Sequence, residues 1–321
     1  MPRKPRLDGT GFLHHVIARG IEKRDIFSGD KDRNFFLERL GKVLTETATL
    51  CYAFALIPNH FHLLLRTGRQ PISTVMRRLL TAYAVHFNRR QKRTGYLFQN
   101  RYRDIICQED AYLLELIRYI HLNPLRAKVV SDLSELDQYK FCGHHFLVEN
   151  KDSPWFQSNL ILEFFGDTTK KARNAYRAYM VDGLKMGKRP EFAGGGLRRS
   201  LGYPKTSPKE RVYHDERILG DSDFVLNLTE EDNLPETDPP FKDIEELAEK
   251  VCQMYSLTKE HLTGEGRSLE ITQARALVSY HGVRSMGMSA AAIARHLGLN
   301  RSSVTRLIGK GSELAQKMDI S

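Results

Sequence analysis

Over the first 130 residues, short apolar runs alternate with stretches whose apolar side chains recur at helical spacing. Runs of strand length occupy residues 12–19, 50–57, 60–66 and 101–108, and helical spacing occupies residues 30–48, 72–93 and 110–122. Only Pro58 and Asn59 separate the second and third runs, so we expect these two strands to be antiparallel neighbours. The order of the elements predicts an α+β, ferredoxin-like β-α-β-β-α-β-α domain with an antiparallel sheet.

The pattern changes after residue 150. Residues 151–243 are rich in Gly, Pro and acidic side chains and contain one stretch of helical spacing at 170–185, which predicts a linking region with some helix. Residues 244–321 return to helical spacing in three or four segments and predict an all-α domain. The chain is therefore expected to have three parts, 1–150, 151–243 and 244–321.

Charge is distributed unevenly along the 321 residues, whose formal net charge is +10. Residues 1–130 hold 23 Lys and Arg against 11 Asp and Glu, whereas the remaining residues hold 26 against 28. The positive field therefore belongs to the first part of the chain. A basic domain of this kind most often binds a polyanion, and nucleic acid is the commonest.

Several features indicate a soluble cytoplasmic protein without a membrane partner. No apolar run is long enough to cross a bilayer, and the N-terminus lacks the apolar region of a signal peptide. The four cysteines are scattered without a CxxC pair, which predicts small buried thiols rather than disulfides or structural zinc. No GxxxxGK[ST] loop occurs, so ATP is not an expected ligand.

Two histidines stand out in the third predicted strand. Alternate side chains of a strand share a face, so His60 and His62 should point the same way while Phe61 points into a core. Two imidazoles at this spacing can reach one divalent ion. The alternative is a pair of partly buried, hydrogen-bonded histidines, which is the commoner outcome for an isolated His-x-His.

A tyrosine and an asparagine on the following helix add to this picture. Tyr119 and Asn123 are four residues apart, on one face of a helix that can lie beside the sheet. A phenol, two imidazoles and an amide suit phosphoryl transfer from DNA, in which a metal polarises the scissile phosphate and the phenol attacks in line. The alternatives are a core aromatic at Tyr119 and an ordinary helix end at Asn123 before Pro124.

Three other residues compete for places in this site. Tyr112 precedes Tyr119 by seven residues, so it lies on a similar helix face about 10 Å along the axis, and it is the rival nucleophile. His15 can either approach the site or pack in the core, and packing is favoured. His121 follows Tyr119 by two residues and should face away.

Basic side chains around the second helix and its exit predict a surface for phosphates. These candidates are Arg77, Arg78, Arg89, Arg90, Arg93, Arg101 and Arg103. Arg101 and Arg103 are expected to alternate on one face of the fourth strand, where they either extend the phosphate surface or are plain exposed charges. Tyr83 and Phe87 share a stripe with Leu79 and are better explained as core than as base-stacking groups.

The last helices suggest a second DNA-binding module. A helix, a turn at Gly298 and a second helix entered at Arg301, Ser302 and Ser303 follow the pattern of a helix-turn-helix, whose second helix reads the major groove. A small helical bundle used for protein contacts is the alternative.

These residues resemble a known family. His60-Phe61-His62 matches the HUH motif, and the segments "HHVIARGIEKRDIF", "IPNHFHLLLR", "GYLFQNRYR" and "YLLELIRYIHLNPLRAKVV" are similar in order and spacing to REP-associated tyrosine transposases. The resemblance spans about residues 10–150. It implies that His60, His62 and Asn123 bind Mg²⁺ or Mn²⁺ and that Tyr119 forms a 5′-phosphotyrosine. Related transposases carry glutamine at the position of Asn123.

Residues 244–316 resemble the DNA-binding domain of the bacterial replication initiator. The segment "LNRSSV" departs from the Arg-Asp-His signature of that family, so its base preference is not carried over. Duplex DNA is the expected partner of this part, and single-stranded or hairpin DNA that of the first part.

The sequence therefore favours a DNA transposase that nicks and rejoins single strands and associates with the bacterial nucleoid. A regulator that binds DNA without cutting it, and a metal-dependent RNA-processing enzyme, are the alternatives. Whether Tyr119 acts within its own chain or across a homodimer is left open.

Overall fold

The structure of the chain is a computed structural model. It describes residues 7, 9–149, 151, 153–186, 189, 192, 215, 217–221, 224, 225, 228, 241, 243–264, 266, 268–284, 286, 288 and 290–315. The chain divides into two compact units. The first contains Leu13–Arg66 and Ile72–Leu234, and the second contains Pro235–Ser321 together with the short segments Gly9–Phe12 and Thr67–Pro71.

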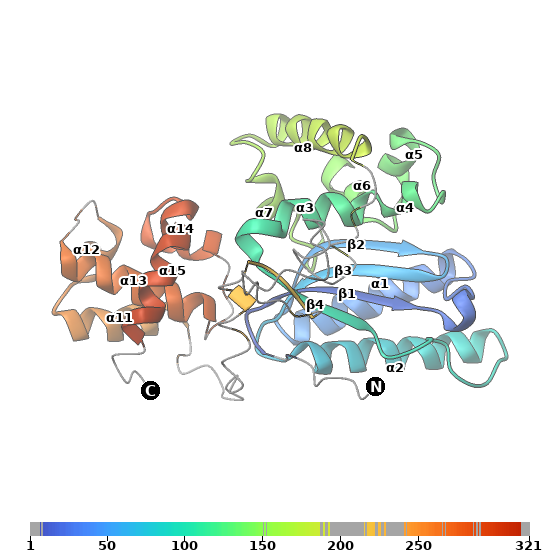
Figure 1. Cartoon of the computed structure of the whole chain (residues 1–321), viewed down its shortest axis with the longest axis horizontal. Coiled ribbons are helices and arrows are strands. Elements are labelled where there is room, and N and C mark those ends of the chain that lie inside the picture. The colour runs from blue at the N-terminus through green and yellow to red at the C-terminus, as the bar shows by residue number, and fades with distance from the viewer. Residues whose placement is uncertain are drawn as a thin grey trace, which may run out of the picture. The chain divides into compact units, whose positions relative to one another are not determined.

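A twisted sheet forms the centre of the first unit (Figure 1). Its strands are β1 (Leu13–Arg19), β2 (Leu50–Ile57), β3 (His60–Arg66), β4 (Arg103–Cys107) and β5 (Ile218–Leu219), in the order β2-β3-β1-β4-β5. The first four strands pair antiparallel, and the two residues between β2 and β3 make the tight connection expected from Pro58 and Asn59. This arrangement confirms the predicted ferredoxin-like fold.

The fifth strand was not predicted. β5 pairs with the edge strand β4 in parallel, so the sheet is antiparallel only over its first four strands. A segment of two residues is too short to show the alternation by which strands are recognised in a sequence. Its apolar side chains Ile218 and Leu219 are buried.

Two helices cover one face of the sheet (Figure 1). They are α1 (Asp30–Glu46) and α2 (Ile72–Arg90), which pack against each other. The apolar stripe of α2 is fully buried, including Tyr83 and Phe87, as its spacing predicted. Phe61 of β3 meets Phe36 of α1 with ring centroids 4.8 Å apart, so the side chain between the two histidines does point into this core.

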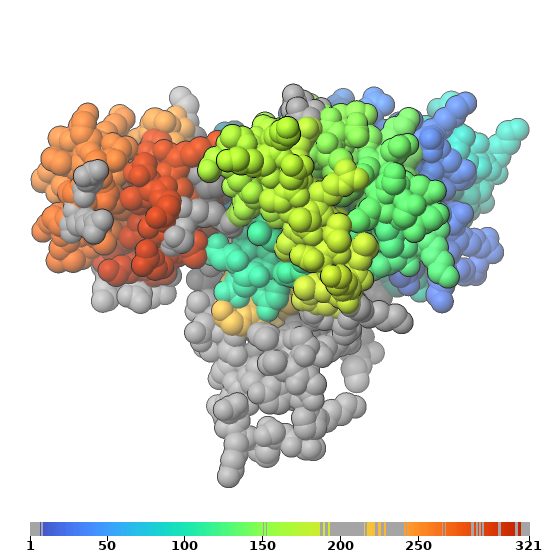
Figure 2. All heavy atoms as spheres, turned by 90° about the horizontal axis from the view of Figure 1, so that it is seen from above, coloured from blue at the N-terminus to red at the C-terminus, as the bar shows by residue number. Residues whose placement is uncertain are grey.

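The other face of the sheet carries the helices that follow β4. These are α3 (Glu109–His121), α4 (Asn123–Arg126), α5 (Leu133–Gln138), α6 (Gly143–Glu149), α7 (Ser158–Leu162) and α8 (Thr169–Leu184). Helices α3, α4 and α6 contact β2 directly, and α8 packs on α3, α6 and α7. Figure 2 shows α8 (yellow-green) covering the surface beside α3 and α6. The helix expected at 170–185 therefore packs on α3.

The second unit is a bundle of five helices among its described residues. They are α11 (Ile244–Tyr255), α12 (Lys259–Thr263), α13 (Leu269–Arg284), α14 (Ala290–Leu297) and α15 (Arg301–Ala315). Leu247, Leu277, Ile293 and Val304 are fully buried at its centre. This unit is all-helical, in agreement with the prediction for residues 244–321.

All four cysteines are buried and unpaired, as their spacing indicated. In the described part of the chain, no helix combines the length and the apolar character that crossing a bilayer requires.

Candidate active site

The two histidines of β3 lie on the face of the sheet that α3 covers. Their ring centroids are 5.2 Å apart, and the rings are nearly perpendicular. This spacing suits two imidazoles that converge on one ion, since metal to nitrogen bonds are about 2 Å long. His62 is buried, whereas His60 is half-buried at the end of the strand.

The surroundings keep these imidazoles neutral. Burial, together with the nearby positive charge of Arg19, lowers the pKa of His60 to about 4. Burial also holds the pKa of His62 well below its usual value, with added repulsion from His15 and His60. Neutral imidazoles carry the free nitrogen lone pair that a metal requires.

Tyr119 of α3 lies against this pair. Its ring centroid is 6.0 Å from that of His62 and 6.0 Å from that of His15, both in edge-to-face geometry. The Arg126 guanidinium lies 5.2 Å from the centroid of the tyrosine ring. A positive charge at this distance favours negative charge developing on the phenol oxygen.

Tyr112, the rival nucleophile, lies almost two turns earlier on the same helix. Its ring packs against Phe192 at 6.4 Å, whereas Tyr119 approaches Phe192 at 5.3 Å and also meets the histidine rings. The geometry therefore favours Tyr119 over Tyr112 as the group beside the histidine pair.

Asn123 does not continue the helix that carries Tyr119. Helix α3 ends at His121, and Asn123 opens the short helix α4 with Pro124 behind it, so the expectation of one continuous helix face was wrong. Pro124 has no N–H to donate to the carbonyl of Ile120 four residues earlier, so the hydrogen-bond ladder of α3 cannot continue through it. Asn123 is 8% exposed, and its Nδ2 has no hydrogen-bond partner among the described residues.

His15 is fully buried, as was favoured from the sequence, and it also approaches the histidine pair. Its Nε2 lies 3.0 Å from Nδ1 of His62, and the two rings stack with centroids 5.3 Å apart. Burial lowers the pKa of His15 to about 4. The register places His15 beside Leu64 and Ile17 beside His62, so His15 and His62 share a face of the sheet.

Phe192 is a further site residue, and nothing in the sequence pointed to it. Its carbonyl oxygen accepts a hydrogen bond from Nδ1 of His15 at 3.1 Å, although 177 positions separate the two residues. The Arg189 guanidinium lies over its ring at 4.4 Å and donates to Glu115 of α3 at 2.9 Å. An isolated apolar residue in a Gly- and Pro-rich stretch gives no periodic signal.

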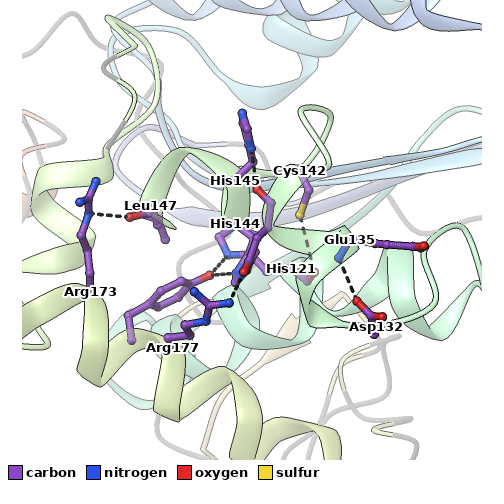
Figure 3. A network of polar contacts seen from close by, with 11 residues as sticks. His121, Asp132, Glu135, Cys142, His144, His145, Leu147, Arg173 and Arg177 are labelled. Atoms are coloured by element: carbon purple, nitrogen blue, oxygen red, sulfur yellow. Dashed lines mark hydrogen bonds and ion pairs between the residues drawn. The ribbon is translucent and has the colours of Figure 1, made fainter. Parts of the chain in front are cut away.

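The opposite side of α3 is held by a second group of buried histidines (Figure 3). Nδ1 of His121 and Nδ1 of His144 lie 2.8 Å and 2.9 Å from the hydroxyl of Tyr176 on α8. His144 Nε2 in turn lies 2.8 Å from Asp137 Oδ1, and Arg177 donates to the other oxygen of Asp137. His121 faces away from Tyr119, as predicted, and anchors α3 to α6 and α8.

Some of the arginines predicted to contact phosphates are exposed, and some form ion pairs. Arg77, Arg89 and Arg101 are exposed. Arg90 is exposed as well, but it donates twice to the buried Asp32 of α1, at 2.7 Å and 2.8 Å, and Arg78 pairs with Glu46.

Arg93 and Arg103 complete the set of arginines predicted to contact phosphates. Arg93 donates to the carbonyl of Tyr96, an aromatic that is 84% exposed. Strand β4 begins at Arg103, so Arg101 precedes it, and the expectation that the two arginines alternate on one strand was wrong.

In the second unit, α14 and α15 are joined by a short turn. Gly298 has a φ of +63°, a left-handed conformation that glycine adopts easily, and the Asn300 side chain caps α15 by accepting from the N–H of Ser303 at 2.8 Å. A pocket of about 700 Å³ beside the turn is lined by Ser303, Arg306 and Lys310. The side chains of Arg301 and Ser302 lie outside the described part.

The histidine pair supplies an incomplete metal-ligand set. Within the described part of the chain, no three His, Cys, Asp or Glu side chains are grouped so that they could hold a metal ion. Two imidazoles would leave coordination positions for further ligands, such as water and a phosphate oxygen, as open catalytic metal sites do.

The antiparallel sheet and the histidine–tyrosine face are the setting in which the comparisons with known proteins can be placed. Residues 10–123, about a third of the chain, match the family described as IS200-like transposase. Among solved structures, the chain is similar to a REP-associated tyrosine transposase bound to a REP hairpin. The identity is 15% and the TM-score 0.39, covering 48% of this chain and 89% of that one. No curated protein matches the chain.

Proposed function

We propose that the protein is a metal-dependent tyrosine transposase that nicks single-stranded or hairpin DNA and rejoins the strands. The observation that carries this proposal is the meeting of Tyr119 with the histidine pair on one face of the sheet, at 6.0 Å from His62. The IS200-like family of residues 10–123 supports the same reaction class.

In this reaction Tyr119 is the nucleophile. Its phenol oxygen attacks the scissile phosphorus in line, the phenol proton passes to solvent, and the bond from phosphorus to the 3′ oxygen breaks. The products are a 5′-phosphotyrosine and a free 3′-OH, which takes up one proton. When a 3′-OH attacks the phosphotyrosine, the phenol is released and the strands are joined, so no external energy source is required.

His60 and His62 would hold Mg²⁺ or Mn²⁺ with Asn123 as the third protein ligand. When bound, the ion stabilises the negative charge that develops on the phosphate oxygens. The buried Nδ2 of Asn123 has no partner among the described residues, and a phosphate oxygen of bound DNA would accept a hydrogen bond from it while the amide oxygen held the ion. Arg126 would stabilise the phenolate before attack.

The exposed arginines Arg77, Arg89 and Arg101 would contact phosphates of the bound strand, with little sequence preference. The α14–turn–α15 segment would bind duplex DNA, with its Arg306 and Lys310 available for phosphates beside the pocket.

A covalent-adduct assay tests this function. The full chain is incubated with Mg²⁺ or Mn²⁺ and labelled hairpins of matched DNA and RNA sequence, taken from beside its own gene, and separated under denaturing conditions. We expect a metal-dependent adduct with DNA that EDTA abolishes. Tight binding of every DNA probe without an adduct would instead indicate a regulator, and an adduct or cleavage with RNA alone would indicate an RNA-processing enzyme.

A further inference from the structure

Behind the two histidines, two short hydrogen-bond relays lead to backbone carbonyls. One runs from Phe192 through His15 to His62, and the other runs from Lys23 through Asn59 to His60. A carbonyl oxygen can only accept a hydrogen bond, so each relay has a fixed direction. The position of every proton along it then follows.

The first relay fixes the proton on His62. Because the Phe192 carbonyl accepts, Nδ1 of His15 carries the hydrogen. The ring is fully buried, which favours its neutral form, so its Nε2 carries a lone pair and no hydrogen. That lone pair accepts from Nδ1 of His62 at 3.0 Å. His62 is also buried, where a neutral ring is favoured, so a hydrogen on Nδ1 leaves its own Nε2 without a proton.

The second relay does the same for His60. Nδ2 of Asn59 donates to the carbonyl of Lys23 at 3.2 Å, which orients the amide so that Oδ1 faces His60. The distance from Oδ1 to Nδ1 of His60 is 2.6 Å, so this nitrogen is the donor and Nε2 is the lone pair. Glu22 and Lys23 have φ values of 53° and 61°, a left-handed backbone that costs energy in residues other than glycine and clusters at functional sites.

We infer that His15 and Asn59 are positioning residues that fix both imidazoles of the pair in the form with a bare Nε2, ready to bind a divalent cation. This inference rests on the proposed function. The Phe192 carbonyl and the Lys23 carbonyl set the two relays, and the hydrogen bond from Arg189 to Glu115 holds Phe192 on α3. Phe192, which follows α8 in the chain, therefore determines through His15 which nitrogen of His62 carries the hydrogen.

The fixed proton positions have an energetic consequence. A histidine that exchanges freely between tautomers spends part of its time in the form that cannot bind metal, and this lowers its apparent affinity for metal. An outer hydrogen bond that fixes the binding-competent tautomer removes this cost. Loss of such outer partners weakens metal binding by about 10–100-fold in other sites.

The direct test is the tautomer of His62 in the metal-free protein. The full chain is labelled with ¹⁵N-histidine, and long-range ¹H–¹⁵N correlations assign the protonated nitrogen in each of the 12 histidines. Wild type, His15→Gln and His15→Phe are compared, and each protein is then titrated with Mn²⁺ alone. Glutamine offers an amide donor for Phe192 and an oxygen acceptor for His62, whereas phenylalanine offers neither.

We expect His62 to be protonated at Nδ1 in wild type and in His15→Gln. In His15→Phe, we expect the form protonated at Nε2 to appear and the Mn²⁺ affinity to fall by about 10–100-fold. His14→Phe is the matched control, because His14 is also fully buried on β1 but faces the opposite way and pairs with Asp104. It should leave both readouts unchanged.

Three results would overturn the relay. These are Nε2 protonation of His62 in wild type, an unchanged tautomer and affinity in His15→Phe, or an equal loss of affinity in His14→Phe. The proposed function fails separately: a wild type with the expected tautomer and Mn²⁺ binding that forms no adduct with DNA would refute transposase chemistry and leave the relay intact.

Discussion

Two clusters of buried histidines lie on opposite sides of α3, and they differ in what they leave unpaired. The sheet-face cluster consists of His15, His60 and His62, and the α6 cluster consists of His121, His144 and its neighbour His145. Burial lowers the pKa of histidines in both clusters, including His15 and His144. Burial and perturbed pKa values alone therefore do not mark the functional cluster.

The hydrogen-bond partners distinguish the two. In the α6 cluster, His144 uses both ring nitrogens on Tyr176 and Asp137, and His145 is tied to the Asp137 carbonyl and to Lys151. In the sheet-face cluster, the contacts engage Nδ1 of His60 and of His62. The first pattern ties both ring nitrogens of His144 and His145 to neighbours, and the Nε2 of His121 that has no partner among the described residues is buried in the interior. The second pattern leaves Nε2 of His60 and of His62 on the side of the sheet where Tyr119 lies.

The largest difference between the two sides should appear when their tyrosines are changed. Tyr119→Phe removes the nucleophile and should abolish the covalent DNA adduct, whereas Tyr176→Phe should retain it. Tyr176→Phe removes a buried hydroxyl that joins two histidines, so it should lower the free energy of unfolding by about 1–3 kcal/mol. Adduct gels and urea unfolding of both variants measure this. An adduct with Tyr119→Phe would contradict the assignment.

Changing one histidine in each cluster should give the next largest contrast. His60→Ala removes a proposed metal ligand and should lower the nicking rate by more than the about 100-fold loss typical of outer-shell changes. His144→Ala should leave the nicking rate within a few fold but lower the melting temperature by several degrees, because Tyr176 and Asp137 lose a buried partner. Single-turnover nicking and thermal unfolding separate the two. An equal loss of nicking in both variants would contradict the assignment of different roles to the two clusters.

Lowering the pH should reduce the free energy of unfolding through the buried His15 of the sheet-face cluster. The folded state keeps His15 neutral down to about pH 4, whereas the unfolded chain protonates it near pH 6.5. Between these values the unfolded state binds more protons, so the free energy of unfolding falls as the pH falls. For the fully buried His15 this amounts to about 2–3 kcal/mol. His15→Gln should lose this part of the pH dependence in urea unfolding measured at pH 6.5 and 4.5, and an unchanged dependence would contradict it.

The smallest expected effect concerns two neighbouring arginines of α2. Arg89 is exposed, so Arg89→Gln should reduce the salt dependence of DNA binding by about one released counterion. Arg90 is paired with the buried Asp32, so Arg90→Gln should leave the salt dependence unchanged and lower stability instead. Binding isotherms at several salt concentrations and thermal unfolding test the pair. The opposite result would indicate that Arg90, and not Arg89, contacts the phosphates.

The sequence was sufficient for the parts of the fold that depend on periodic patterns. The alternation around His60 and the helical spacing of Leu79, Tyr83 and Phe87 predicted which face each element buries, and the structure agrees. The short strand β5 was missed because two residues carry no period. The end of α3 before Asn123 was expected, but its restart as the four-residue helix α4 was not.

Candidate site residues could be predicted where they fall on elements with a clear periodic pattern. His60, His62 and Tyr119 fall on predicted elements, and the fold brings them together. The roles of His15 and Phe192 depend on contacts across 47 and 177 positions, which no local pattern encodes. Sequence alone also could not separate Arg89 from Arg90, since their difference lies in the position of Asp32.

The central claim is that Tyr119, held beside the histidine pair, becomes covalently linked to DNA. The most direct measurement is to form the adduct with Mn²⁺ and a labelled hairpin, digest protein and DNA, and locate the remaining nucleotide by mass spectrometry of the peptides. The account predicts a phosphate-linked nucleotide on Tyr119. A nucleotide on Tyr112 or on any other residue would contradict it.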